Sequence, residues 1–205
     1  MKVNSDEVEY WDRVAKKATE KGAVANYYKI GEIVRRLLRY SFWGTRVLEI
    51  GAGQCLVAMN LKNLAHFEYI GTEISQVYCR HVNERMGLGI MQADITDLPV
   101  ENGTVDFLLA LDVLEHVRPD IRYEGYQEIG DKMRPGGLMF INNPVLGTVS
   151  YPKREFEFPF NIYHLDGLIE DAGLELLFFE RYGIDVVMDI GTDHREYEWM
   201  VLRKK

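Results

Sequence analysis

The chain has few cysteines, a deficit of basic residues and no long apolar run, and each scarcity excludes a class of protein. Its 205 residues include two cysteines, Cys55 and Cys79, so disulfide bonds are not expected to stabilise it, which suits a reducing compartment. No apolar stretch approaches the roughly 18 residues of a membrane-spanning helix. The charged opening segment K-V-N-S-D-E-V-E does not have the character of a signal peptide. We therefore expect a cytoplasmic protein without a membrane span.

Acidic residues outnumber basic ones, 32 to 24, which gives a formal net charge of −8. A protein that neutralises several nucleic-acid phosphates needs a face lined by Lys and Arg, so nucleic acid is not the expected partner. Arg35, Arg36 and Arg39 share one helical stretch and could form a local basic patch, although a solvated helix face is the simpler interpretation. The length and the 47% hydrophobic content predict a single domain over residues 1–205.

A glycine-rich turn follows an apolar segment in R-V-L-E-I-G-A-G-Q-C, residues 46–55. Gly51 and Gly53 allow backbone conformations that a side chain would forbid, so a ligand can lie against bare peptide. A helix starting near residue 54 would direct unpaired N–H groups to the same place. Leu56 occupies the position of the third glycine in the NAD-binding pattern G-x-G-x-x-G, so that pattern is incomplete. A nucleoside ligand without phosphates is therefore the better expectation.

The hydrophobic pattern alternates between strands and helices, which predicts a Rossmann-like, doubly wound α/β fold with a mostly parallel sheet of seven strands. An amphipathic helix over residues 27–42 is expected to cover the sheet. We expect strands at 46–50, 68–73, 89–92, 105–111, 138–142, 174–180 and 196–202, and further helices at 54–65, 75–86, 120–133 and 164–172.

Four motifs occur in order within residues 46–144, namely E-I-G-A-G from Glu49, Glu73 after a strand, Q-A-D-I-T-D-L-P from Gln92 followed by V-D-F-L-L-A-L-D-V-L-E-H-V, and R-P-G-G-L from Arg134. With these motifs, residues 46–144 resemble the class I S-adenosylmethionine-dependent methyltransferases of small-molecule type. Two positions depart from the family pattern: Cys55 replaces a common glycine, and the acid at position 73 is Glu instead of Asp. The resemblance also implies that the last two strands form an antiparallel pair at the sheet edge.

The resemblance implies S-adenosylmethionine as cofactor, and the chemistry of the ligand suggests a role for each acid. Glu73 ends a strand and can accept both ribose hydroxyls. Asp94, with the backbone N–H of Ile95, would bind adenine, although Asp94 or Asp97 could instead cap the following turn. Glu49 would face the methionine ammonium directly or through water, and Leu111 would offer it a carbonyl. The implied cofactor residues are Glu49, Gly51, Ala52, Gly53, Glu73, Ile74, Asp94, Ile95, Leu111 and Asp112.

Methyl transfer from a sulfonium depends chiefly on alignment, so few catalytic side chains are needed. His116 is the candidate general base for a hydroxyl acceptor, His164 is a weaker one, and His116 could also be structural. Residues 1–45 are interpreted as an N-terminal helical cover. The proline- and aromatic-rich segment 143–164 is interpreted as a lid or substrate loop, or as a loop packed by its own aromatics. Candidate substrate residues are Tyr10, Trp11, Tyr28, Tyr151 and His164.

Two other functions remain open from the sequence. Asp112, Glu115, His116 and His164 could hold a divalent cation, as in the metal-dependent methyltransferases that modify RNA 3′ ends, although the acidic balance opposes RNA. A noncatalytic S-adenosylmethionine-binding module is also possible, because nothing in the glycine turn performs chemistry. The favoured hypothesis is methyl transfer to oxygen or nitrogen of a small molecule, without a metal.

Overall fold

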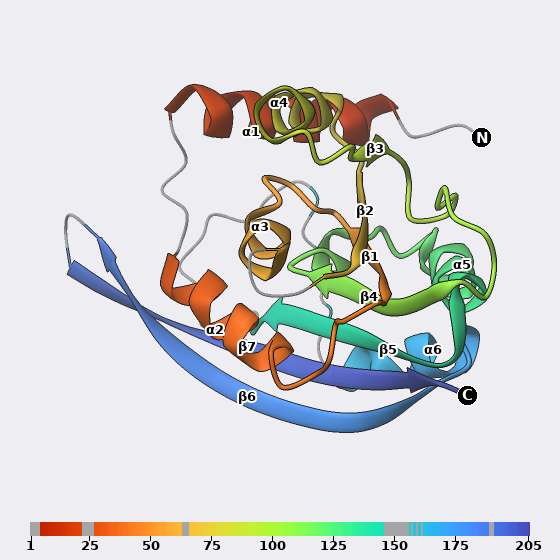
Figure 1. Cartoon of the computed structure of the whole chain (residues 1–205). Helices are drawn as coiled ribbons and strands as arrows, with labels where there is room; N and C mark the ends of the chain where they lie inside the picture. Colours follow the sequence, from red (N-terminus) through yellow and green to blue (C-terminus); the bar gives the residue numbers. More distant parts are fainter. Residues whose placement is uncertain are drawn as a thin grey trace.

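The computed structural model describes residues 5–21, 27–62, 66–145, 156, 158, 160, 162–188 and 191–205. Within these residues seven strands form one mixed sheet in the order β3-β2-β1-β4-β5-β7-β6 (Figure 1). The elements are, in chain order, α1 (Ser5–Lys21), α2 (Tyr27–Leu37), β1 (Arg46–Ile50), α3 (Leu56–Lys62), β2 (Glu68–Glu73), α4 (Gln76–Met86), β3 (Met91–Gln92), β4 (Val105–Leu111), the 3-10 turn η1 (Leu114–His116), α5 (Arg122–Lys132), β5 (Met133–Pro144), η2 (Ile162–His164), α6 (Leu165–Asp171), β6 (Leu174–Met188) and β7 (Gly191–Lys204).

The parallel part of the sheet confirms the expected Rossmann-like α/β class. β1 pairs in parallel with both β2 and β4, and β4 pairs in parallel with β5. The three expected strands at 46–50, 68–73 and 105–111 have the predicted bounds. Leu108 and Leu109 of β4 are fully buried, as a central strand covered on both faces requires.

The two C-terminal strands are antiparallel, as expected, but both are much longer than their apolar cores predicted. β7 pairs with β5 on one side and with β6 on the other, so the edge strand is β6. The hairpin of β6 and β7 extends past α2 in Figure 1. Its outer part is rich in polar residues, which is why hydrophobic alternation did not reveal its length.

Two differences between the predicted and the observed helix bounds have a clear local cause, and α4, α5 and α6 lie within two residues of their predicted bounds. α2 ends at Leu37 instead of residue 42, because the chain then closes two i to i−3 turns and directs Phe42 into the core. α3 begins at Leu56 instead of residue 54, because Cys55 has a φ of 54°, a left-handed conformation that a right-handed helix cannot include. The helix therefore starts two residues later than expected.

Helices cover both faces of the sheet, with a separate apolar cluster on each. α5 and α6 contribute Ile129 and Leu168 to one cluster, and α2 and α3 contribute Leu37 and Leu61 to the other. α1 packs against α4 beyond the carboxyl ends of the parallel strands, at the top of Figure 1. This arrangement leaves α1 above the edge where class I ligands would bind.

Much of the predicted lid, residues 143–164, falls outside the described residues. Of its aromatics, Phe156 and Phe160 are described and are buried. Residues 146–155 are not described, and Tyr151 lies among them. Within the described part of the chain, no helix combines the length and the apolar character needed to cross a bilayer.

Candidate active site

The turn after β1 places bare peptide at the carboxyl edge of the sheet. Gly51 and Gly53 have φ values of 61° and 51°, so both occupy the left-handed region that favours glycine. A Cβ built on Gly51 would lie 2.5 Å from Cγ2 of Val113, so glycine is required there for close packing as well. The N–H of Ala52 donates to the carbonyl of Thr72 at 2.9 Å, which fixes the turn against β2. The turn is thus a rigid wall with no side chain at its closest points.

Glu73 ends β2 beside this turn. Its carboxylate accepts hydrogen bonds from the backbone N–H groups of Gly53 at 2.8 Å and Ser75 at 2.9 Å, one on each oxygen. Burial raises the pKa of Glu73 above its ordinary value, and these two donors oppose the rise. Each carboxylate oxygen has a second lone pair, so both can still accept a hydroxyl.

Asp94 follows β3 and is 8% exposed. One of its oxygens, Oδ1, accepts both the backbone N–H and the hydroxyl of Thr96, each at 2.9 Å. Asp94 therefore caps the turn, the alternative that the sequence left open, and it also lines the cavity described below together with Ile95. The cap uses Oδ1 and leaves Oδ2 for a ligand.

Asp112 sits at the corner after β4 in a left-handed conformation, with a φ of 57°. Its N–H donates to the carbonyl of Asn142 at 2.7 Å, and the amide of Asn142 donates to Oδ1 at 2.8 Å. Lys29 of α2 forms an ion pair with the other oxygen. These contacts hold a non-glycine residue in a strained backbone region, a feature that clusters at functional sites.

Glu49 is buried but does not lie among the described residues that line the cavity, and the same holds for Ala52 and Leu111. The hydroxyl of Tyr69 donates to Oε2 of Glu49 at 2.6 Å. Burial raises the pKa of this carboxyl to about 7, although the tyrosine hydrogen bond opposes the shift. Glu49 is therefore not part of the described cavity wall, and its expected interaction with the ammonium, directly or through water, stays a prediction.

His116 closes η1 and lines the cavity. Its Nδ1 lies 2.6 Å from the carbonyl oxygen of Phe156, so Nδ1 carries a proton and donates. Nε2 lies 3.7 Å from Oε1 of Glu115, and the imidazole packs edge-on against the indole of Trp11 with ring centroids 4.8 Å apart. The segment expected to act as a lid thereby fixes the orientation of the histidine ring.

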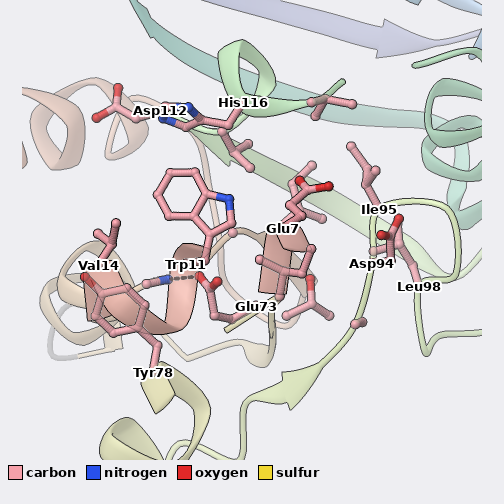
Figure 2. Close-up of a pocket in the computed structure, with 18 of the residues that line it drawn as sticks. Glu7, Trp11, Val14, Glu73, Tyr78, Asp94, Ile95, Leu98, Asp112 and His116 are labelled. Carbon is pink, nitrogen blue, oxygen red and sulfur yellow. Dashed lines mark hydrogen bonds between the residues drawn. The ribbon is translucent and has the colours of Figure 1, made fainter. Parts of the chain in front are cut away.

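These groups meet in one cavity of about 420 Å³ between the carboxyl edge of the sheet and α1 (Figure 2). That volume lies within the usual range of small-ligand sites, roughly 300–1,000 Å³. Predicted residues supply much of the wall, namely Trp11, Gly51, Gly53, Glu73, Ile74, Asp94, Ile95, Asp112 and His116. Residues that were not predicted supply the rest, namely Glu7, Val14, Ala18, Ile50, Thr72, Tyr78, Ala93, Leu98, Val113, Val117 and Ile121.

Two of the other candidate substrate residues, Tyr10 and His164, are not brought to this wall. Tyr10 packs its ring against Phe156 at 5.1 Å, and His164 is exposed in η2; neither is among the described lining residues. The side chain of Tyr28 and the whole of Tyr151 lie outside the described residues. Among these candidates, Trp11 alone lines the cavity in the part of the chain that the structure describes.

The contribution of α1 was the largest omission from the sequence-based site. Glu7, Trp11, Val14 and Ala18 recur at intervals of three or four residues, which places them on one helix face, and all four line the cavity. That periodicity was available in the sequence, but it does not reveal which surface the face covers. Within the described ranges, no group of three or more His, Cys, Asp or Glu side chains is arranged to hold a metal ion.

Comparison with known proteins agrees with this geometry. Residues 47–137 match the family model described as a methyltransferase domain. A protein of Mycolicibacterium smegmatis named "probable S-adenosylmethionine-dependent methyltransferase" is 28% identical over 174 residues, which cover 84% of this chain and 65% of that protein. A similarly named protein of Mycobacterium tuberculosis is 26% identical over 170 residues, or 80% of this chain and 58% of that protein. The chain thus spans 58–65% of the length of these curated relatives.

Solved structures share the fold. An S-adenosylmethionine-dependent methyltransferase from Archaeoglobus fulgidus has a TM-score of 0.67 and 18% identity, with 86% of this chain and 94% of that chain covered. Phosphoethanolamine N-methyltransferase 2 of Haemonchus contortus, in complex with phosphomonomethylethanolamine and S-adenosylhomocysteine, has a TM-score of 0.64 and 13% identity, with 87% and 53% covered. Residues 47–137 are therefore similar to the methyltransferase domain, and the described residues share the Rossmann-like α/β fold of these methyltransferases.

Proposed function

We propose that this chain binds S-adenosylmethionine in the cavity under α1 and transfers the methyl group to oxygen or nitrogen of a small-molecule acceptor. One observation carries the proposal: the glycine turn, Glu73 and Asp94 meet in a single cavity of about 420 Å³. Bare peptide, a strand-end acid and a second acid after the next strand match the methionine, ribose and adenine parts of the cofactor. The cavity has the volume for such a ligand.

Each polar group of the cofactor has a partner in this assignment. Glu73 accepts the ribose hydroxyls with the lone pairs that Gly53 and Ser75 leave unused. Oδ2 of Asp94 accepts an adenine amino hydrogen. The turn at Gly51 lies against the methionine portion, and the buried Glu49 contributes negative charge from behind it.

The acceptor loses a proton when it is a hydroxyl, and His116 is the group that takes it. The carbonyl of Phe156 holds the proton on Nδ1, so Nε2 is the basic atom. As the acceptor oxygen forms its bond to the methyl carbon, its proton passes to Nε2. The carbon–sulfur bond breaks with its electron pair left on sulfur, which gives neutral S-adenosylhomocysteine. An amine acceptor follows the same displacement and loses its proton afterwards.

Two observations support a small acceptor. The net charge of −8 opposes binding to a phosphate backbone. Trp11 of α1 covers the cavity next to His116, so an acceptor reaches the methyl group inside an enclosed space. The Haemonchus contortus enzyme with the same fold is described with a small phosphorylated amine.

Calorimetry and a turnover assay test the proposal in two stages. Purified protein is expected to bind S-adenosylhomocysteine, and a panel of hydroxyl and amine acceptors is expected to yield S-adenosylhomocysteine from S-adenosylmethionine. His116→Asn should lower turnover of a hydroxyl acceptor by about 100-fold, the usual contribution of a general base, while cofactor affinity stays within a few fold. Binding without turnover on any acceptor would favour the noncatalytic module instead.

A further inference from the structure

The carboxylate of Glu7 forms part of the cavity wall, although it comes from α1 and not from the carboxyl edge of the sheet. The residue is 6% exposed and lines the cavity one helical turn before Trp11. Figure 2 shows Glu7 in the space between Trp11 and Asp94. The proposed function gives this buried acid no role.

One oxygen of Glu7 has no hydrogen-bond donor among the described residues. Oε2 is buried without a partner, and Nε of Arg118 lies 3.7 Å away, also buried without an acceptor. That separation is too long for a hydrogen bond. Oε2 is fully buried and faces Arg118, so a ligand in the cavity cannot reach it. The other oxygen, Oε1, is not among the fully buried atoms, and it is the one that a donor on a ligand can reach.

The surroundings of Glu7 identify the part of the ligand that supplies this donor. Burial raises the pKa of Glu7 to about 7; Arg118 opposes the rise, and the negative charges of Asp94 and Asp120 add to it. Asp94 is thus close enough for its charge to act on Glu7, and both line the cavity with Ile95. In the proposed function this is the adenine end of the site, whereas Glu73 holds the ribose.

We propose that Glu7 is a specificity-determining residue for adenine, whose carboxylate accepts the amino hydrogen that Asp94 does not bind. This proposal rests on the proposed function and adds a residue from outside the sheet edge. The exocyclic amino group of adenine has two hydrogens, and the two carboxylates approach it from α1 and from the turn after β3. Arg118 acts as a positioning residue, since its charge favours the ionised, accepting form of Glu7.

Hypoxanthine is the base that such a site rejects. It carries a carbonyl oxygen where adenine carries the amino group. The two carboxylate oxygens would then face a third acceptor, with no hydrogen-bond donor at that position of the base. A site built to hydrogen-bond an N–H group discriminates strongly against an analogue that lacks it, because its buried groups are then left unpaired. The ratio of the affinities for the two compounds therefore measures base recognition by Glu7, and it does so separately from the overall affinity for the cofactor.

The test compares S-adenosylhomocysteine with its deaminated analogue, S-inosylhomocysteine, by calorimetric titration at pH 8. The wild type is expected to prefer the adenine compound by about 100-fold or more, consistent with hydrogen bonds to two charged acceptors. Glu7→Gln should narrow that preference by about 10-fold, because the amide accepts less strongly from adenine and can donate to the hypoxanthine oxygen. Glu9→Gln, an exposed position on the same helix, should leave the preference unchanged.

Glutamine has the shape of glutamate and adds no charge to bury, so Glu7→Gln is expected to fold as well as the wild type. A preference that is unchanged in Glu7→Gln overturns the assignment. An equal loss of affinity for both compounds also overturns it, because it would mean that Glu7 supports α1 without reading the base. A wild type that binds neither compound would contradict the proposed function itself, which separates the two failures.

Discussion

At the scale of single residues, Glu73 has the most direct link between sequence and ligand. Glu73→Ala is expected to weaken binding of S-adenosylhomocysteine by about 10- to 100-fold, because hydrogen bonds to a charged group are worth roughly 1.5–3 kcal/mol. Calorimetric titration measures the change. Glu68→Ala is the matched control, since Glu68 lies at the other end of the same strand, away from the cavity, and forms an ion pair with Arg46. Equal affinity of Glu73→Ala and the wild type would remove Glu73 from the site.

Glu49 is expected to make stability depend on pH. Burial raises its pKa from the ordinary value of 4.5 to about 7 in the folded chain. The folded state therefore holds more protons between these values, so the contribution of Glu49 to stability is fully present below pH 4.5 and is lost as pH rises through 7. The full loss from this one group is about 3 kcal/mol, at 1.36 kcal/mol per pKa unit.

Urea unfolding at pH 5, 6, 7 and 8 checks this prediction with Glu49→Gln, which keeps an acceptor for the hydroxyl of Tyr69. The stability of the variant should decline much less with rising pH than that of the wild type. Part of the decline should remain, because the pKa of Glu7 is also raised to about 7. Parallel pH profiles for the wild type and the variant would show that Glu49 does not titrate in this range.

The sequence allowed prediction of site residues whose role depends on local spacing. It did not allow prediction of residues that reach the site only because their helix packs over the sheet. Gly51, Gly53 and Glu73 could be predicted because a turn and the next strand end necessarily meet at one sheet edge. Glu7 could not, because its helix reaches the cavity only through tertiary packing. The role predicted for Glu49, to face the methionine ammonium directly or through water, stays a prediction, because Glu49 is not among the described lining residues and its carboxylate accepts the hydroxyl of Tyr69.

At the scale of elements, the glycine turn after β1 tolerates no Cβ at its first glycine. Gly51→Ala is expected to lower stability by about 1–3 kcal/mol, because the new methyl group would overlap Val113 and the left-handed φ is unfavourable for alanine. Thermal and urea unfolding measure the loss.

The matched control for this substitution is Gly31→Ala, which lies inside α2 with no atom within 4 Å of the added Cβ. That change should stabilise the chain by about 0.5–1 kcal/mol, the helix preference of alanine over glycine. Loss of stability in both variants would contradict the specific role of the turn.

α1 is held in place partly by capping another helix. Oδ1 of Asp12 accepts the hydroxyl of Ser75 at 2.6 Å and the N–H of Val77 at 3.1 Å, at the start of α4. Asp12→Ala is expected to cost about 1 kcal/mol, as the loss of a helix cap does, and to raise hydrogen exchange in α1. Lys17→Ala, at an exposed position of α1, should change neither quantity. Unaltered exchange in Asp12→Ala would mean that other contacts hold the helix.

The bounds of β1, β2 and β4 could be predicted, whereas those of β3, β5, β6 and β7 differ from the prediction by two or more residues at one end or both. The segments 46–50 and 105–111 are mostly apolar and mostly buried, which made their limits recognisable. The end of α2 at Leu37 and the start of α3 at Leu56 depend on backbone conformations that the side-chain pattern does not encode. Helix ends are therefore decided by tertiary packing as much as by propensity.

At the scale of the whole molecule, the cavity lies between α1 and the sheet, so a bound ligand would contact both. S-adenosylhomocysteine at 100 times its dissociation constant should stabilise the folded state by about 2.7 kcal/mol. For a domain of this size that corresponds to a rise in melting temperature of roughly 5–10 °C. A thermal-shift assay measures it, with NAD as the control ligand expected to give no shift. A shift with NAD and none with S-adenosylhomocysteine would contradict the phosphate-free site.

The topology was predictable in its parallel part and less so in its C-terminal part. Alternating strand and helix signals favour parallel neighbours, and β1, β2 and β4 pair as expected. The long hairpin of β6 and β7 was predicted only as two short strands, since register between distant segments depends on contacts that a linear pattern does not contain.

The strand order has a consequence for synthesis on the ribosome. Within the described residues, β6 pairs with β7 and with no other strand, while β7 pairs with β5. A nascent chain that has emerged as far as Met188 thus has a long strand with no partner to join. Residues 191–204, which form β7, must emerge before β5 and β6 can each pair with their neighbour in the sheet. Until then, the unpaired backbone edges of β5 and β6 are exposed together with the side chains of Leu176 to Phe179, which stay exposed in the folded chain. That interval is therefore the one in which chaperone protection would matter most.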